Sequence, residues 1–296
     1  MGDAGLGTEK GKETRMEVKT SFKVEEGTVQ ETLMMPLYGR VYCEEHFPNT
    51  FPNKAAKETA AKVDYDFGKV KSSELNMVTW GLRARMLQDA ANDYLTKHPK
   101  ATIINLGCGL DLSFDEIDNG ICRFINMDLP DVIAAREQIV SCKEREINFA
   151  GDLMDFSWME RIQDEPYGVN VSDGVYIICG GVLMYFHTEQ MKRFFLALAD
   201  AFPGGGICFD GENQRGLEKS NKIVQKTGNG SEIHFPIENS RALFASWGDC
   251  FQNVTERPLP TYVRKSREIP LKWKIVLSMG MRLGMVKLID VSFQKR

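Results

Sequence analysis

Short apolar runs alternate with amphipathic segments along the part of the sequence that follows Pro99. Five mostly apolar runs stand at Thr102–Leu106, Arg123–Met127, Ile147–Ala150, Gly174–Cys179 and Gly206–Asp210. Apolar residues recur at helical spacing between these runs, at about 131–144 and 187–201. Nearly continuous apolar strands that alternate with helices are typical of a parallel sheet covered on both faces. The pattern therefore predicts an open α/β sheet.

The residues before Pro99 carry helical spacing instead. Apolar positions recur at helical intervals from Val29 to Val41, and Pro36 interrupts them, which predicts two short helices or one kinked helix. A further helix is predicted at about 53–62. A long amphipathic helix, capped by Ser72 or Ser73, should follow and end before Pro99. These helices would form a cap at residues 27–99, ahead of an α/β core at 100–296.

The last third of the chain adds helical insertions to this core, at about 214–226, 239–247 and 270–284. Strands are predicted at Phe251–Glu256 and Val286–Phe293, and we expect the second to be an antiparallel strand at the edge of the sheet. Residues 1–26 are charged, glycine-rich and poor in aromatic residues, so they are expected to form a disordered tail. Residues 27–296 are expected to fold as a single domain.

Composition narrows the classes of function. The formal net charge is −4, which gives no reason to expect nucleic acid or an anionic membrane as a partner. The most apolar run, 174–186, is shorter than the roughly 20 residues that a membrane span needs, and no signal peptide is recognisable, so a cytoplasmic protein is expected. The seven cysteines form no C-x-x-C pair and the four histidines no i, i+4 pair, so no metal site is predicted. The oligomeric state stays open.

The turn after the first predicted strand contains two closely spaced glycines, Gly107 and Gly109. Glycines there permit a tight turn and let the backbone approach a ligand, although a tight turn alone would also need them. Asp128 follows the second strand, 19 residues after Gly109, close to the spacing at which an acidic side chain holds ribose hydroxyls. A helix N-cap is the alternative role for this aspartate. Leu112 replaces the third glycine of the dinucleotide fingerprint, which disfavours a nicotinamide-dependent oxidoreductase.

Two further strand ends and one helix complete the predicted site. Asp152 and Leu153 follow the third strand, where they are suited to the amine and ring of adenine. The fourth strand ends in paired glycines that leave room for a ligand above the strand. Arg83 lies beside the apolar stripe of the long helix and would reach the same rim to pair with a ligand carboxylate, unless it is a solvated surface charge. Together these positions predict a nucleoside-binding site.

Several of these segments resemble the leucine carboxyl methyltransferase superfamily, in particular its polyketide O-methyltransferases of the tetracenomycin type. The similar segments are 32–40, 105–111, 127–130, 151–153, 182–186, 202–205 and 226–229. The resemblance implies a Rossmann-like methyltransferase sheet that binds S-adenosylmethionine. It places Arg83 at the methionine carboxylate, Gly107 and Gly109 at the turn, Asp128 at the ribose, and the Asp152–Leu153 pair at adenine. Many relatives carry a glutamate where this sequence has Gly180, so the resemblance gives that position no ligand role.

The resemblance further implies methyl transfer to a carboxylate or a phenolic hydroxyl of a small, polyketide-like molecule. Tyr185, Tyr38 and Arg40 are our candidates for the acceptor side. A carboxylate is already ionised at neutral pH, whereas a phenol, with a pKa of about 10, benefits from a general base. The sequence identifies no such base. A methyltransferase acting on a protein's C-terminal leucine carboxyl, and a catalytically silent cofactor-binding module, are the alternatives.

Overall fold

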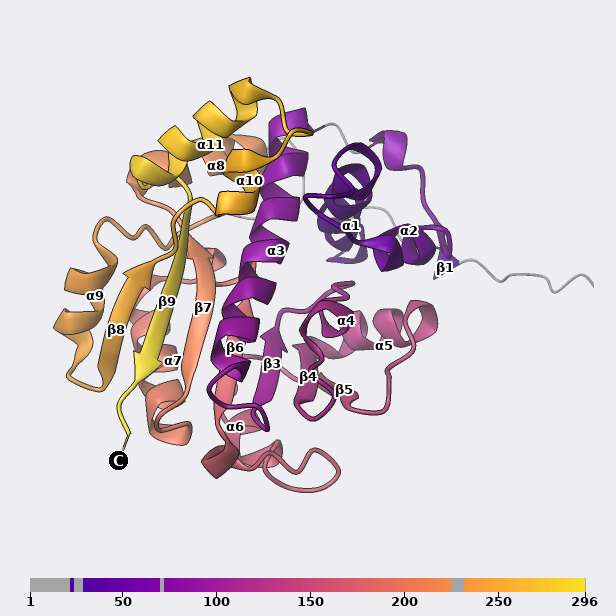
Figure 1. The fold of residues 1–296 in the computed structure, drawn as a ribbon. Coiled ribbons are helices and arrows are strands. Elements are labelled where there is room, and N and C mark those ends of the chain that lie inside the picture. The colour runs from indigo at the N-terminus through magenta and orange to yellow at the C-terminus, as the bar shows by residue number, and fades with distance from the viewer. Residues whose placement is uncertain (1–21, 24–28, 70–71, 225–231, 296) are drawn as a thin grey trace, which may run out of the picture.

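The computed structural model describes residues 22–23, 29–69, 72–224 and 232–295. Most of the predicted tail and the 226–229 segment lie outside the described residues. The short strand β1 (Phe22–Lys23) pairs in parallel with β2 (Val63–Asp64), a contact that the sequence did not predict. Everything else described packs around one larger sheet (Figure 1).

The main sheet has seven strands in the order β5-β4-β3-β6-β7-β9-β8. The strands are β3 (Thr102–Leu106), β4 (Arg123–Asp128), β5 (Glu146–Ala150), β6 (Val175–Cys179), β7 (Gly206–Gly211), β8 (Phe251–Glu256) and β9 (Lys287–Phe293). Strands β3 to β7 are parallel, which confirms the prediction of a parallel α/β sheet. The chain moves outward from β3 through β4 to β5 and then returns to the other side of β3 with β6. In open α/β sheets, ligands bind in the crevice outside the carboxyl ends of the strands at such a reversal, which here lies between β3 and β6.

The last strand is antiparallel, as predicted, but it does not lie at the edge of the sheet. Strand β9 is hydrogen-bonded to β7 on one side and to β8 on the other, so β8 is the edge strand. Burial explains the difference, because five of the seven residues of β9 are buried whereas only Phe251 is buried in β8. The more apolar strand takes the interior position, although it comes later in the chain.

Helices cover both faces of the sheet. The α-helices are α1 (Val29–His46), α2 (Lys54–Ala60), α3 (Glu74–Leu95), α4 (Phe114–Ile117), α5 (Pro130–Ile139), α6 (Trp158–Arg161), α7 (Thr188–Ala201), α8 (Gln214–Val224), α9 (Ser240–Trp247), α10 (Thr261–Lys265) and α11 (Leu271–Arg282). Single 3₁₀ turns are η1 (Phe67–Lys69), η2 (Val171–Asp173) and η3 (Leu183–Tyr185). Helix α1 continues through Pro36, so the chain does not break into two helices there. The full burial of Met34 and Leu37 on either side of the proline explains this, because tertiary packing outweighs the local helix-breaking tendency.

The core lies on both faces of the sheet. On one face, Phe194 and Phe195 of α7 pack with Phe209 of β7 and the aromatic residues of α9. On the other face, α3 packs its apolar stripe onto alternate residues of β3 and β6, such as Ile103. Helix α3, which Ser73 caps as predicted, runs across the front of the sheet in Figure 1. It therefore covers the sheet itself, while α1 and α2 form the outer cap beside it.

Candidate cofactor-binding site

The glycine turn after β3 packs directly against the segment that follows β6. Gly107 and Gly109 have positive φ angles of 62° and 47°, a conformation that favours glycine. A Cβ atom on Gly107 would lie 2.2 Å from the Cγ2 atom of Val182. The first glycine is therefore needed for close packing, and it holds the two strand ends that flank the crevice together.

Asp128, at the end of β4, is hydrogen-bonded to the same turn. Its Oδ2 atom accepts the N–H of Gly109 at 2.8 Å, and its Oδ1 atom accepts the N–H of Leu129 at 2.8 Å. Burial raises the pKa of this carboxyl, while the two N–H groups favour its charged form. Each oxygen still has a lone pair for a further donor. The side chain thus faces the turn with acceptor capacity in reserve, as a site for ribose hydroxyls requires.

Arg83 reaches the crevice from α3 and is held there by Asp210, the penultimate residue of β7. The Nη1 atom of Arg83 donates to Oδ2 of Asp210 at 3.0 Å, and Oδ1 of Asp210 accepts the N–H of Gly181 at 2.7 Å. The two side chains are only 19% and 10% exposed, so Arg83 is not a solvated surface charge. The sequence interpretation missed Asp210, although it ends the fifth predicted strand and Asp128 directly follows the second.

The structure also explains the glycine at position 180. A Cβ atom there would lie 2.7 Å from Cδ1 of Leu87 and 3.5 Å from Nε of Arg83. A larger residue at this position would therefore require the side chain of Leu87 to shift. Gly180 is therefore matched to the close approach of α3.

The turn after β5 continues the site on the far side of Asp128. The N–H of Gly151 donates to the carbonyl of Asp128 at 2.9 Å. Asp152 is exposed and its Oδ1 atom accepts the N–H of Met154, while Leu153 is half-buried against the core. The predicted cofactor residues therefore lie in one series of contacts along the C-terminal ends of the strands, which we call the carboxyl edge of the sheet. The series runs from α3 and β7 through the ends of β6, β3 and β4 to β5.

A buried arginine that the sequence interpretation missed supports the glycine turn from below. Arg136 of α5 is fully buried, and its Nη1 atom donates to the carbonyls of Gly109 at 3.0 Å and Asp111 at 2.6 Å. Its Nη2 atom lies 3.3 Å from Glu146 on β5. The signal in the sequence was a charged residue within the apolar stripe of α5, among Val132, Ile133, Ala135 and Ile139.

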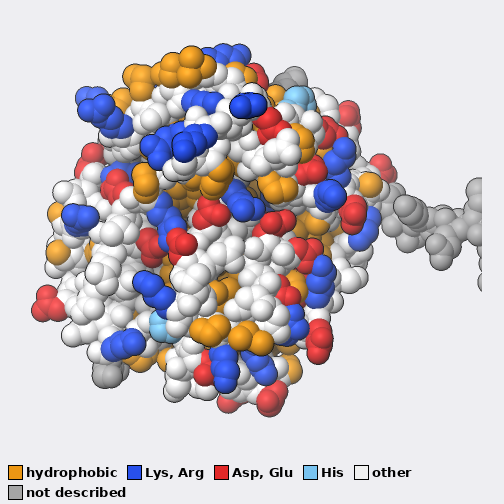
Figure 2. Space-filling model, viewed as in Figure 1, with side chains coloured by type: hydrophobic (Ala, Val, Ile, Leu, Met, Phe, Trp, Pro, Cys, Tyr) orange, Lys and Arg blue, Asp and Glu red, His pale blue; other side chains and the backbone are white. Residues whose placement is uncertain are grey.

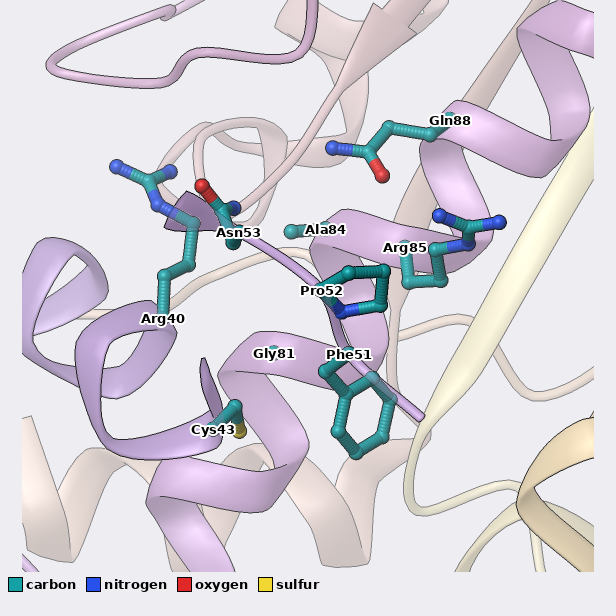
Figure 3. Close-up of a pocket in the computed structure, with 9 residues that line it drawn as sticks. All are labelled: Arg40, Cys43, Phe51, Pro52, Asn53, Gly81, Ala84, Arg85 and Gln88. Carbon is teal, nitrogen blue, oxygen red and sulfur yellow. The ribbon is translucent and has the colours of Figure 1, made fainter. Parts of the chain in front are cut away.

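The three residues predicted for the acceptor side have different surroundings. Arg40 is buried and engaged by the glycine turn, with Nη1 2.9 Å from Asp111 and Nη2 donating to the carbonyl of Leu110 at 2.7 Å. It also lines a pocket of about 10 Å³ between α1 and α3, which has room for only one water molecule (Figure 3). Tyr38 stacks on Phe67. Tyr185 in η3 is 39% exposed, and its hydroxyl is within electrostatic range of Arg83 and Asp210.

Glu212, directly after β7, is a buried carboxyl beside this group. Its Oε2 atom accepts from Oγ of Ser220 at 2.7 Å, and its Oε1 atom has no hydrogen-bond partner among the described residues. Burial, with a smaller contribution from the neighbouring Asp210, raises the pKa of Glu212 to about 7 against the opposing effects of Ser220 and Arg83. No sequence motif marked this residue. Its pKa is suited to accepting a proton near neutral pH.

Two further observations concern metals and membranes. Within the described ranges, no three His, Cys, Asp or Glu side chains are grouped so that they would hold a metal ion. None of the helices in the described part of the chain is both long enough and apolar enough to cross a bilayer.

The sheet order and its flanking helices define a class of protein, the α/β methyltransferase-type fold. Solved structures share this fold. A methyltransferase structure from Thermobifida fusca has a TM-score of 0.53 at 15% identity and covers 92% of this chain and 96% of its own. A DUF574 family protein from Streptomyces avermitilis has a TM-score of 0.55 at 10% identity and covers 88% of this chain and 97% of its own.

The chain belongs to the leucine carboxyl methyltransferase family, whose model matches residues 25–199. It is also 23% identical over 219 residues to the tetracenomycin polyketide synthesis O-methyltransferase TcmP of Streptomyces glaucescens. This match covers 73% of this chain and 77% of that protein. The predicted family and fold are thus confirmed. The protein is an S-adenosylmethionine-dependent methyltransferase, as the resemblance implied.

Proposed function

We propose that this enzyme transfers a methyl group to an oxygen atom of a small, polyketide-like molecule, either a carboxylate or a phenolic hydroxyl. The similarity to TcmP, whose name assigns it to polyketide synthesis, supports this acceptor class. The continuous series of contacts from Arg83 to Asp128 along the carboxyl edge supports the placement of the methyl donor there. That edge is the observation on which the proposal depends.

The residues of the edge fit S-adenosylmethionine part by part. Arg83 is held by Asp210 through one nitrogen, which leaves Nη2 for the methionine carboxylate. Asp128 would accept the ribose hydroxyls, with Gly107 and Gly109 beneath the sugar. Asp152 and Leu153 would contact adenine. When bound, S-adenosylmethionine supplies an electrophilic methyl group on a sulfonium.

The chain's own contribution to methyl transfer is alignment. Arg83 and Asp210 are ion-paired before any ligand binds, so little side-chain freedom is lost on binding. Correct alignment of two reacting groups is worth about 7–11 kcal/mol in favourable intramolecular reactions. Tyr185, and less directly Tyr38 and Arg40, are proposed to shape the acceptor side.

Glu212 separates the two acceptor chemistries. A phenolic hydroxyl would donate to the unpartnered Oε1 atom, and Glu212 would take its proton as the oxygen attacks. A carboxylate has no proton to give and needs no base. The Glu212→Gln variant is therefore expected to lose hydroxyl methylation by about 10²–10⁴-fold while keeping carboxylate methylation.

The donor site is tested by calorimetric titration with S-adenosylmethionine. We expect saturable binding by the wild type and a Kd at least tenfold higher for Asp128→Asn, because a charged hydrogen-bond acceptor is lost. Asp131→Asn, an exposed aspartate three residues further on, is the matched control and should bind normally. Equal affinity of the Asp128→Asn variant would contradict the proposed ribose contact.

The acceptor is tested by mass spectrometry of products with matched pairs, such as 2-naphthol and 2-naphthoic acid, together with a peptide that ends in leucine. A gain of one methyl group by either small molecule supports the proposal. Methylation of the peptide alone would favour the protein carboxyl alternative. Binding of S-adenosylmethionine without any methylated product would favour a silent binding module.

A further inference from the structure

Large apolar side chains are exposed along one helix, α11, which is remote in sequence from the donor-binding turns. Eight large hydrophobic side chains are strongly exposed among the described residues, and five of these lie on α11 or directly after it. The five are Leu271, Ile275, Val276, Met279 and Leu283, with Leu271 70% and Met279 56% exposed. At 100° per residue they occupy one side of the helix.

The opposite side of α11 is apolar as well. Leu277 is buried in the core beneath α3, with Trp273 and Met281 packed beside it. A surface helix of a water-soluble domain normally has a polar outer side that faces solvent. Contiguous exposed apolar patches of this kind mark interaction sites. The outer side of α11 is therefore expected to meet a second apolar phase or surface.

Positive charge surrounds this apolar stripe. Residues 261–283 contain six Lys or Arg and a single acidic residue, although the whole chain has a net charge of −4. Lys272 and Arg282 stand on the exposed side of α11 itself, and Arg264, Lys265 and Arg267 are exposed just before it. Figure 2 shows the hydrophobic side chains gathered at the top of the molecule, over α11, with Lys and Arg side chains beside them. The overall acidic charge conceals this local excess.

This combination determines the kind of partner. A second copy of the chain would bring two positively charged segments together, which like-charge repulsion disfavours. The hydrophobic side chains over α11 lie at the outer surface of the molecule, where they are accessible to a flat surface (Figure 2). Helices with an apolar side and a surround of Lys and Arg lie in the plane of anionic lipid headgroups. We propose that α11 and the basic residues around it dock the enzyme on an anionic lipid surface.

The proposal is tested by sedimentation of the full chain with vesicles. Binding to vesicles of phosphatidylcholine with 30% phosphatidylserine is expected to exceed binding to pure phosphatidylcholine and to weaken as salt is raised. The Ile275→Ser/Met279→Ser variant should lose binding to both compositions, because it removes the inserted apolar side chains. Its matched control is Ile121→Ser, which removes a side chain that is 54% exposed elsewhere on the surface.

Reversal of charge separates the electrostatic contribution from the apolar one. The Arg267→Glu/Arg282→Glu variant is expected to reduce partition onto phosphatidylserine vesicles by roughly 25-fold or more, because each basic residue near such a surface contributes about fivefold. Both double variants should bind S-adenosylmethionine with unchanged affinity, which shows that they are folded. Equal binding to both vesicle compositions overturns the proposal. So does loss of binding by Ile121→Ser, or a dimer without lipid that Ile275→Ser/Met279→Ser abolishes.

Discussion

Glu212→Gln is expected to change how the stability of the protein depends on pH. Glu212 is buried in the folded protein with a pKa raised from 4.5 to about 7. Below pH 4.5 the carboxyl is protonated in both the folded and the unfolded chain, so its burial carries no charge penalty. As the pH rises towards 7, the unfolded chain ionises first, and the folded state loses stability relative to it.

The size of this effect follows from the two pKa values. The difference between 4.5 and about 7, at 1.36 kcal/mol per pH unit, is about 3 kcal/mol of stability lost between pH 4 and pH 8. Glutamine does not ionise, so the variant should gain about 3 kcal/mol on the wild type over this range. The amide takes the place of a carboxyl whose Oε1 atom has no hydrogen-bond partner among the described residues, and an unpaired buried amide group adds a penalty of about 1–3 kcal/mol that is independent of pH. The slope with pH, not the absolute stability, is therefore the quantity to compare.

Urea unfolding followed by circular dichroism, at intervals from pH 4 to pH 8, measures this slope. Glu218→Gln is the matched control, because Glu218 is an exposed carboxylate on the adjoining helix α8. The control should follow the wild type at every pH. A stability difference between Glu212→Gln and the wild type that stays flat with pH, or that falls as the pH rises, would refute the raised pKa and with it the case for Glu212 as a base.

Three other substitutions test how the edge of the sheet is held together. Arg136→Met should destabilise the fold by about 3–5 kcal/mol in urea unfolding, because it leaves a buried carboxylate without its partner. Gly107→Ala should cost about 2–4 kcal/mol through its clash with Val182 and its positive φ, and Gly107→Ala/Val182→Gly should recover part of this loss. Asp210→Asn releases Arg83 and should raise the Kd for S-adenosylmethionine about tenfold in calorimetry, whereas unchanged affinity would show that the pair does not position the donor.

The sequence predicted the parallel strands well because their signals are local. The run Thr102–Leu106 is apolar at nearly every position and is buried throughout. The position of the last strand within the sheet could not be predicted from local signals. Whether Lys287–Phe293 pairs with one strand or two depends on residues far away in the chain, and only the assembled sheet shows that it lies between β7 and β8.

The residues of the candidate site likewise divide into those with a local sequence signal and those without one. Asp128 stood out because it follows a strand at a spacing with a known physical use. Arg40 is predicted on the acceptor side as a residue of the helical cap, and in the structure its guanidinium is paired with Asp111, which is 71 residues away in the chain. Contacts at such separation leave no periodic or local signal. Glu212 also has no such signal, because an acidic residue directly after a strand is just as common in an ordinary turn.

The arrangement of charge at the carboxyl edge bears on which form of the ligand is retained. Asp210 is neutralised by Arg83, but neither Asp128 nor Glu212 forms an ion pair with a described residue. Once ionised, the two carboxylates give the edge an excess of negative charge in a partly buried setting, where charges interact more strongly than in water. S-adenosylmethionine carries a positive sulfonium, and the thioether left after methyl transfer does not. In the proposed binding mode, these residues would therefore favour the positively charged donor over its neutral thioether product.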